Sequence, residues 1–204
     1  MSTTFMLSRP QMHRLQELAT AAVGNVSRGL TEMFSAVVAV TALHVRVVPL
    51  NEVSDIVGSP DLEVVVIYLQ ADGAIPAHLL LLMEYPTALD LCDALMEQEP
   101  GTTEELGEME ESALGEVGNI VGSFFLNSLA ENTGMRLDIT PPAVGCDMAG
   151  AAMSAALAEV AMFADEAVVI DANFEHKGRR LPAWFLAFPS PDQLRAALDQ
   201  GAHS

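Results

Sequence analysis

The chain repeats one order of predicted elements twice, about a hundred residues apart, and this repeat limits the possible folds more than any other feature. Each half contains a hairpin signal, in which a β-rich run, a turn dipeptide and a returning apolar run follow one another. The hairpins are predicted over residues 62–83, with the turn at Asp72-Gly73, and over residues 167–188, with the turn at Lys177-Gly178. A helix is predicted after each hairpin, over residues 87–97 and 191–199.

Each half also opens with a long helical pattern and a strand-like segment behind it. The helices are predicted over residues 10–38, where Gly24 or Gly29 could break the pattern, and over residues 104–132, with Thr102 and Glu105 as a capping box and Gly134 as the C-cap. The strands are predicted over residues 43–50 and 135–140. The repeat unit is thus helix, strand, short helix, hairpin, helix.

Two copies of this unit predict an α/β (α+β) fold. We expect a pseudo-two-fold, two-repeat sandwich in which the long helices pack on a shared, largely antiparallel β-sheet. Residues 1–204 are expected to form a single domain, with one repeat at about 8–100 and the other at about 102–200.

Acidic residues dominate the charge, because 28 Asp and Glu against 9 Lys and Arg give a net charge of −19. Such a field repels phosphate groups, so nucleic acid and anionic membranes are poor partners. Residues 1–12 lack the pattern of a signal peptide, and the longest apolar run, at residues 36–43, is too short to span a bilayer. We therefore expect a cytoplasmic protein with no nucleic-acid partner and no membrane insertion.

The sequence shows no pattern typical of a metal or nucleotide site. Cys92 and Cys146 stand alone among apolar residues, where both are expected to be small buried side chains, and the five histidines are scattered. There is no GxSxG, GxGxxG or P-loop run. We expect neither a metal site nor a cofactor of the chain's own.

The second long helix carries two stripes at helical spacing. Val117, Ile120, Val121 and Phe124 form an apolar stripe, and Ser112, Glu116, Asn119 and Ser123 form a polar one. Gly115 and Gly118 lie beside the polar stripe and weaken the helix by up to about 1 kcal/mol each. Either tight packing against a neighbouring helix or the close approach of another macromolecule would explain them. The spacing alone predicts no more than a solvated face.

A longer pattern of four residues, which includes Glu116 and Asn119, is more specific than the polar stripe alone. Ser112, three residues, Glu116, two residues, Asn119, then 22 residues and Pro142 resemble the signature of the CheC/CheX/FliY phosphatase family. The two repeats cover nearly the whole chain, as in CheC. The resemblance implies an α/β sandwich, catalytic roles for Glu116 and Asn119, and supporting roles for Ser112 and Pro142.

The first half departs from the signature. An offset of 99 residues places His13, Glu17, Thr20 and Leu43 under the four signature positions, so only the glutamate survives. A rival offset aligns Gly24-Asn25 with Gly118-Asn119, but it puts Ala22 at the glutamate position. We interpret Glu17 and Thr20 as a degenerate first site, which makes the chain most like a CheC with a single intact site.

The resemblance also implies a reaction. The family's substrate is a response regulator such as CheY, phosphorylated on an aspartate, with Mg2+ bound by that partner. By resemblance, Asn119 orients the attacking water and Glu116 pairs with the regulator's active-site lysine. The chain would then be a response-regulator aspartyl-phosphate phosphatase.

Two alternatives remain open. Members of the family also bind the receptor deamidase CheD, so the chain could be a weakly catalytic or non-catalytic adaptor for phosphorylated CheY, for a CheD-like deamidase, or for both. A flagellar-switch component of the FliY kind is the third interpretation. The basic hairpin tip at residues 177–180 could contact a partner, although a solvated turn explains it more simply.

Overall fold

The computed structural model describes residues 7–34, 36–73, 75–130, 137–161 and 165–200. Within these residues, seven strands form one sheet in the order β1-β6-β7-β3-β2-β4, and β5 also pairs with β2. Every pairing is antiparallel. The strands are β1 Ala39–Pro49, β2 Glu63–Gly73, β3 Ala77–Glu84, β4 Leu137–Ile139, β5 Ala143–Met148, β6 Glu166–His176 and β7 Arg179–Pro189.

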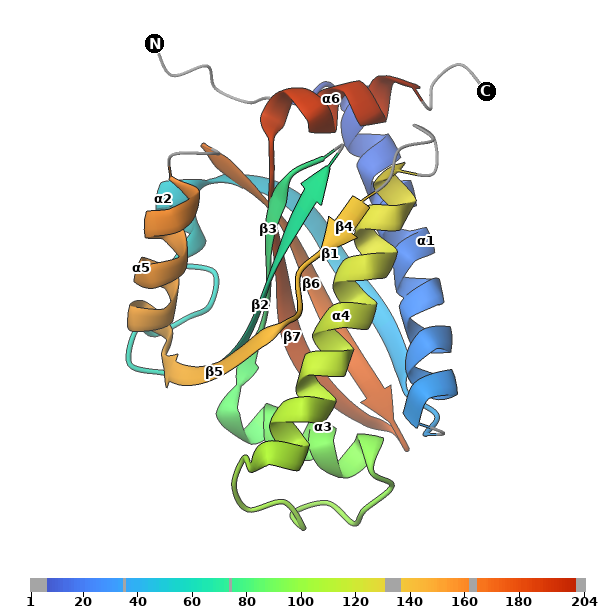
Figure 1. The fold of residues 1–204 in the computed structure, drawn as a ribbon, viewed down its shortest axis with the longest axis vertical. Coiled ribbons are helices and arrows are strands. Elements are labelled where there is room, and N and C mark those ends of the chain that lie inside the picture. The colour runs from blue at the N-terminus through green and yellow to red at the C-terminus, as the bar shows by residue number, and fades with distance from the viewer. Residues whose placement is uncertain (1–6, 35, 74, 131–136, 162–164, 201–204) are drawn as a thin grey trace.

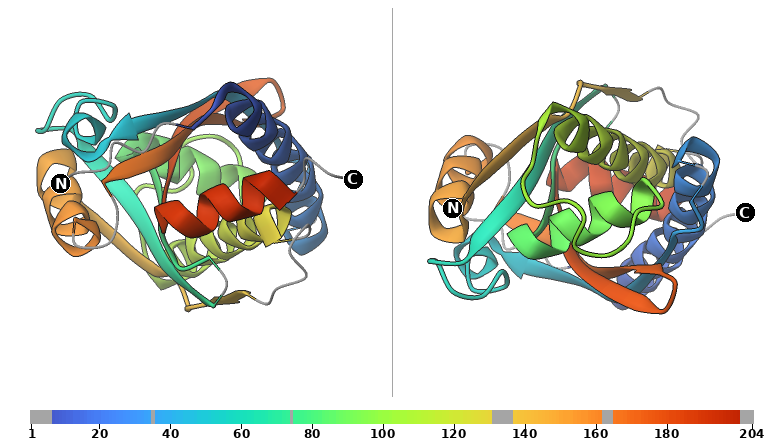
Figure 2. Two further views of the ribbon diagram at one scale, coloured as in Figure 1. Left: turned by 90° about the horizontal axis from the view of Figure 1, so that it is seen from above. Right: turned by 90° about the horizontal axis from the view of Figure 1, so that it is seen from below.

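Helices cover both faces of this sheet (Figure 1). They are α1 Arg9–Phe34, α2 Leu50–Val53, α3 Tyr85–Leu95, α4 Glu108–Ala130, α5 Ala149–Val160 and α6 Pro191–Gln200. The larger hydrophobic core lies between the sheet and α1, α3, α4 and α6, and a smaller core lies under α2 and α5. Figure 2 shows α6 crossing one end of the long helices and α3 lying at the other.

The strand order is symmetric about its centre. The two returning strands, β3 and β7, pair with each other in the middle of the sheet. Strand β1 of the first half pairs with β6 of the second, while β4 and β5 of the second half pair with β2 of the first. The halves therefore exchange their first strands across one continuous sheet. This arrangement confirms the predicted fold class.

Helix α1 is continuous and ends earlier than the sequence predicts. Gly24 and Gly29 do not break it, and a Cβ at Gly29 would lie 2.7 Å from Cε2 of Phe124, so this glycine allows α1 and α4 to pack closely. The helix ends at Phe34 rather than at residue 38. Ala36 and Val38 are buried in the larger core instead of continuing the helix.

The predicted capping box before α4 is wrong. Helix α4 begins at Glu108, and the Glu110 carboxylate accepts a hydrogen bond from the Gly107 N–H at 3.0 Å, as the third residue of a capping box does. The hydroxyl of Thr102 donates to the Glu99 carbonyl at 2.5 Å. The predicted C-cap, Gly134, lies outside the described residues.

The buried carboxylate of Asp93 explains why the segment before α4 is a loop. Asp93 is 1% exposed and accepts hydrogen bonds from the N–H groups of Gly101, Thr102 and Thr103 at 2.7–3.1 Å. These bonds hold the loop against α3. A helix starting at residue 104 would need Thr102 as its cap. The N–H groups of Thr102 and Thr103 instead donate to the Asp93 carboxylate, so this segment stays a loop.

The two hairpins end differently. Lys177 and Gly178 have φ angles of 48° and 80°, which is the two-residue turn that the sequence predicts. In the first hairpin the last β2–β3 pair is Ala71 with Ala77, and Asp72 and Gly73 extend β2 to pair with β4. The first connection is therefore longer than the dipeptide turn predicted for it. In the described part of the chain, no helix is both long and apolar enough to cross a bilayer.

Candidate functional site

The polar stripe of α4 faces solvent. Ser112 and Glu116 are exposed and Asn119 is partly exposed, whereas Val117 and Gly118 between them are buried. Within the described part of the chain, neither Glu116 nor Asn119 makes a side-chain hydrogen bond or ion pair. The structure thus presents a carboxylate and an amide one turn apart on one helix face, and both are available to a partner.

The glycines beside the stripe pack against the sheet. A Cβ at Gly118 would lie 2.3 Å from Cγ2 of Ile67 on β2, and one at Gly122 would lie 3.2 Å from Cδ1 of Leu79 on β3. The sequence left open whether another macromolecule or a neighbouring helix explained Gly118. The structure answers that a strand of the chain's own sheet does, because no side chain fits between α4 and β2 at this level.

Pro142 lies beside the same turn of α4. A Cβ at Gly115 would be 3.4 Å from Cγ of Pro142, so the proline contacts the helix next to Glu116. After α4 the chain runs back along β4 toward the start of the helix (Figure 1). This path brings Pro142 next to Gly115, although the two residues are far apart in sequence. The structure therefore brings all four signature positions to one region.

A bulge in the sheet positions Pro142. Ile139 pairs with Ala71 and Ala143 pairs with Tyr68, so residues 140–142 face only residues 69–70. Thr140 exchanges two hydrogen bonds with the backbone of Gln70, each 2.9 Å long. The two prolines that follow lack an N–H to continue the ladder, so the predicted strand divides into β4 and β5. Strand β5 was not predicted from the sequence, although Pro141-Pro142 was the signal for the division.

The first half of the chain supports the offset of 99 residues. The six buried residues of α1 fall on residues of α4 that are also buried: Leu15, Leu18, Ala19, Ala22, Val26 and Leu30 on Leu114, Val117, Gly118, Val121, Phe125 and Leu129. The rival offset would place Leu18 and Ala22 on the exposed Ser112 and Glu116. Strand β1 also has a register shift between Ala42 and His44, the level that corresponds to the bulge at Pro142.

Glu17 and Thr20, the counterparts of Glu116 and Asn119, are engaged within α1. The Glu17 carboxylate lies 3.3 Å from Nη1 of Arg14 and 3.5 Å from Nδ1 of His13. The Thr20 hydroxyl donates to the Gln16 carbonyl at 2.8 Å. The first half therefore offers neither a free carboxylate nor an amide at these positions.

Other ionisable groups lie away from the stripe. Burial alone would raise the pKa of Asp93, but its hydrogen bonds from Thr103, Gly101 and Thr102 outweigh burial and lower it. Burial raises the pKa of the Cys92 thiol to about 12. Cys146 is exposed on β5, which contradicts the prediction that both cysteines are buried. Among the described residues, no group of His, Cys, Asp and Glu could hold a metal ion.

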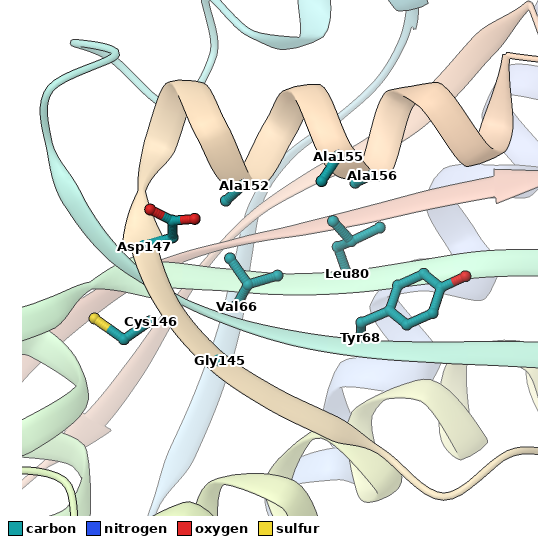
Figure 3. Close-up of a pocket in the computed structure, with 9 residues that line it drawn as sticks. All are labelled: Val66, Tyr68, Leu80, Gly145, Cys146, Asp147, Ala152, Ala155 and Ala156. Carbon is teal, nitrogen blue, oxygen red and sulfur yellow. The ribbon is translucent and has the colours of Figure 1, made fainter.

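A cavity of about 310 Å3 lies on the opposite face of the sheet from α4. Figure 3 shows Val66, Tyr68 and Leu80 as its floor and alanines of α5 as its roof, with Cys146 and Asp147 at one end. Its lining includes none of the signature residues. The candidate site is thus an exposed helix face, a shape that fits a macromolecular partner better than a small molecule.

Comparisons with known proteins find similarity in the same region. A model of the CheC-like family matches residues 109–145, which include all four signature positions. The CheY-P phosphatase CheC of Bacillus subtilis (strain 168) is 27% identical over 192 residues, which is 92% of each chain. The chain is thus similar to CheC-like proteins over its signature region and to one CheC along most of its length.

Two solved structures share the fold. Thermotoga maritima FliY matches with a TM-score of 0.76 and 19% identity, over 97% of this chain and 98% of that one. A chain of the CheX-CheY-BeF3-Mg+2 complex from Borrelia burgdorferi matches with a TM-score of 0.50 and 20% identity, over 86% of this chain and 97% of that one.

Proposed function

We propose that the chain removes the phosphoryl group from the phospho-aspartate of a CheY-like response regulator, using Glu116 and Asn119. The observation that supports this most is the exposed carboxylate and the partly exposed amide on α4, neither of them engaged by another side chain, with Pro142 packed beside them. The relative named CheY-P phosphatase CheC, which aligns over 92% of this chain, supports the same reaction.

Asn119 positions the water. Its amide donates one hydrogen bond and accepts another, so it can hold a water in line with the phosphorus without adding negative charge near the phosphoryl oxygens. The water oxygen bonds to phosphorus, the bond from phosphorus to the aspartate oxygen breaks, and inorganic phosphate and a free carboxylate result. Because α4 is fixed against β2 at Gly118, the amide is held on a rigid element.

Glu116 docks the regulator. Its exposed carboxylate pairs with the lysine of the regulator's active site and sets the register in which Asn119 enters. The Mg2+ that neutralises the phosphoryl charge belongs to the regulator, and this chain brings no cofactor to the reaction. Ser112 supports the polar face of α4 that meets the regulator, and Pro142 shapes the backbone segment that packs beside this face.

The test separates the two roles kinetically. Asn119→Ala should lower kcat by about 100-fold or more, since misplacing a reacting group costs that much. Glu116→Ala should chiefly raise KM, by about 30-fold, because removing one partner of a desolvated charge pair costs about 2 kcal/mol. Glu17→Ala and Thr20→Ala are matched controls in the first half and should leave both constants unchanged. Full activity in Asn119→Ala would disprove the proposed mechanism.

A second candidate is an adaptor that binds the phosphorylated regulator with little turnover. The engagement of Glu17 by Arg14 and His13 favours it, because only one face of the chain is left for catalysis. Binding of a regulator loaded with BeF3 and Mg2+, together with an unchanged rate of phosphate loss, would support this function instead. A CheD-like deamidase stays a predicted partner, which co-purification with such a protein would test.

A further inference from the structure

We infer that Met109 is a docking residue that contacts the response regulator and contributes to its affinity. This inference rests on the proposed function and extends it to a residue outside the signature. The Met109 side chain is 69% exposed although methionine is apolar, and it lies in the first turn of α4. Exposed methionine is enriched where proteins meet, because its flexible thioether adapts to a partner surface.

The position of Met109 on the helix connects it to the site. Met109 is seven residues before Glu116 and ten before Asn119, so it lies on the same face, about 10 Å and about 15 Å away along the helix axis. A protein interface of standard size buries about 800 Å2 on each partner, which is a disc with a radius of about 16 Å. A regulator whose active site receives Asn119 therefore reaches Met109.

The start of α4 is ordered before any partner binds. The Gly107 N–H donates to Glu110, and the Gly107 carbonyl accepts from Glu111 at 2.9 Å. The preceding residue, Leu106, packs against the larger core, and its N–H donates to the Tyr85 hydroxyl at 3.3 Å. Little backbone entropy is thus lost when a partner covers Met109, so the apolar area it buries contributes to affinity.

The charges around Met109 indicate the chemistry of the surface it contacts. Glu108 and Glu111 are exposed in the same first turn of α4, and Glu116 is exposed two turns further along on the side of Met109. An apolar side chain at an acidic helix end fits a surface with an apolar centre and a lysine or arginine rim. We therefore expect the regulator to present such a patch beside its phosphorylation site.

The experiment measures binding and turnover separately. A CheY-like regulator loaded with BeF3 and Mg2+ is titrated by calorimetry into wild type, Met109→Ala, Met109→Leu and Met148→Ala, and phosphate loss from the phosphorylated regulator is followed for each. Met148 is the matched control, because it is 50% exposed but lies at the end of β5 beside α5 (Figure 1). Met109→Ala should raise Kd and KM about tenfold and leave kcat unchanged, Met109→Leu should restore most of the affinity, and Met148→Ala should match wild type.

Two results would overturn the inference, and they differ from each other. If Met109→Ala binds as tightly as wild type while Asn119→Ala still loses turnover, Met109 is no docking residue and the proposed function stands. If wild type neither binds the loaded regulator nor speeds phosphate loss, the proposed function fails and the inference fails with it. Circular dichroism on each variant confirms that a changed affinity does not come from unfolding.

Discussion

Replacing Gly118 by alanine should destabilise the protein even though alanine is the better helix former. The new Cβ would lie 2.3 Å from Cγ2 of Ile67, closer than such atoms pack. Ile67 is fully buried on β2, and its γ2 methyl sits next to the backbone, so it cannot move aside like the tip of a long side chain. Either α4 lifts from the sheet or Ile67 leaves its preferred rotamer.

The expected magnitude follows from two opposing effects. Overpacking a buried site costs about 1–3 kcal/mol, and the better helix propensity of alanine returns up to about 1 kcal/mol. The free energy of unfolding should therefore fall by about 1–2 kcal/mol, and Tm by roughly 2–8 °C for a chain of this size. Urea and thermal unfolding followed by circular dichroism measure both quantities.

Gly24 is a control position at which alanine should change the free energy of unfolding in the opposite direction. It lies in the middle of α1, and a Cβ there would meet nothing within 4 Å. Gly24→Ala should therefore raise the free energy of unfolding by about 0.5–1 kcal/mol. If Gly118→Ala also stabilises the protein, close packing against Ile67 does not explain this glycine.

Two further predictions concern the elements that hold α4. Asp93→Asn should lower the free energy of unfolding by about 1–3 kcal/mol, because an amide accepts fewer of the three backbone N–H bonds. Since folding lowers the pKa of Asp93, its contribution is present above the unfolded value of 3.8 and is lost as the pH falls through the lower folded value. Urea unfolding between pH 6 and pH 3 should thus show a flatter loss of stability in Asp93→Asn than in wild type, and an identical slope would contradict this. Gly29→Ala should cost about 1 kcal/mol in thermal unfolding, because its Cβ would meet the Phe124 ring at 2.7 Å, and a stabilised variant would show that the ring moves aside freely.

The sequence predicts the architecture well because the same signals occur twice. The β-branched runs, the Lys177-Gly178 turn and the helical periods are local, and their repetition implies a shared sheet without any knowledge of long-range contacts. The pairing of strands between the two halves could not be predicted in this way. The exchange of β1 with β4 and β5 depends on the packing of the whole chain.

The shared helix face of the candidate site residues could be predicted from their spacing, but their surroundings could not. Periodicity places Glu116 and Asn119 on one polar face, whereas the reason for Gly118 depends on Ile67, about fifty residues earlier. The capping error at Thr102 has the same origin, because a buried acid from α3, Asp93, takes the backbone groups of that segment. Local propensity cannot show a competitor that arrives from another element.

In the proposed reaction, the amide of Asn119 positions the attacking water, and the rest of α4 presents this amide to the regulator. The most direct measurement is the decay of the phosphorylated regulator at saturating concentrations of wild type, Asn119→Ala and Asn127→Ala, where Asn127 is an exposed asparagine two turns further along α4. We expect fast decay with wild type and Asn127→Ala, and decay close to the regulator's own rate with Asn119→Ala. Equal decay with wild type and Asn119→Ala would contradict this role of Asn119.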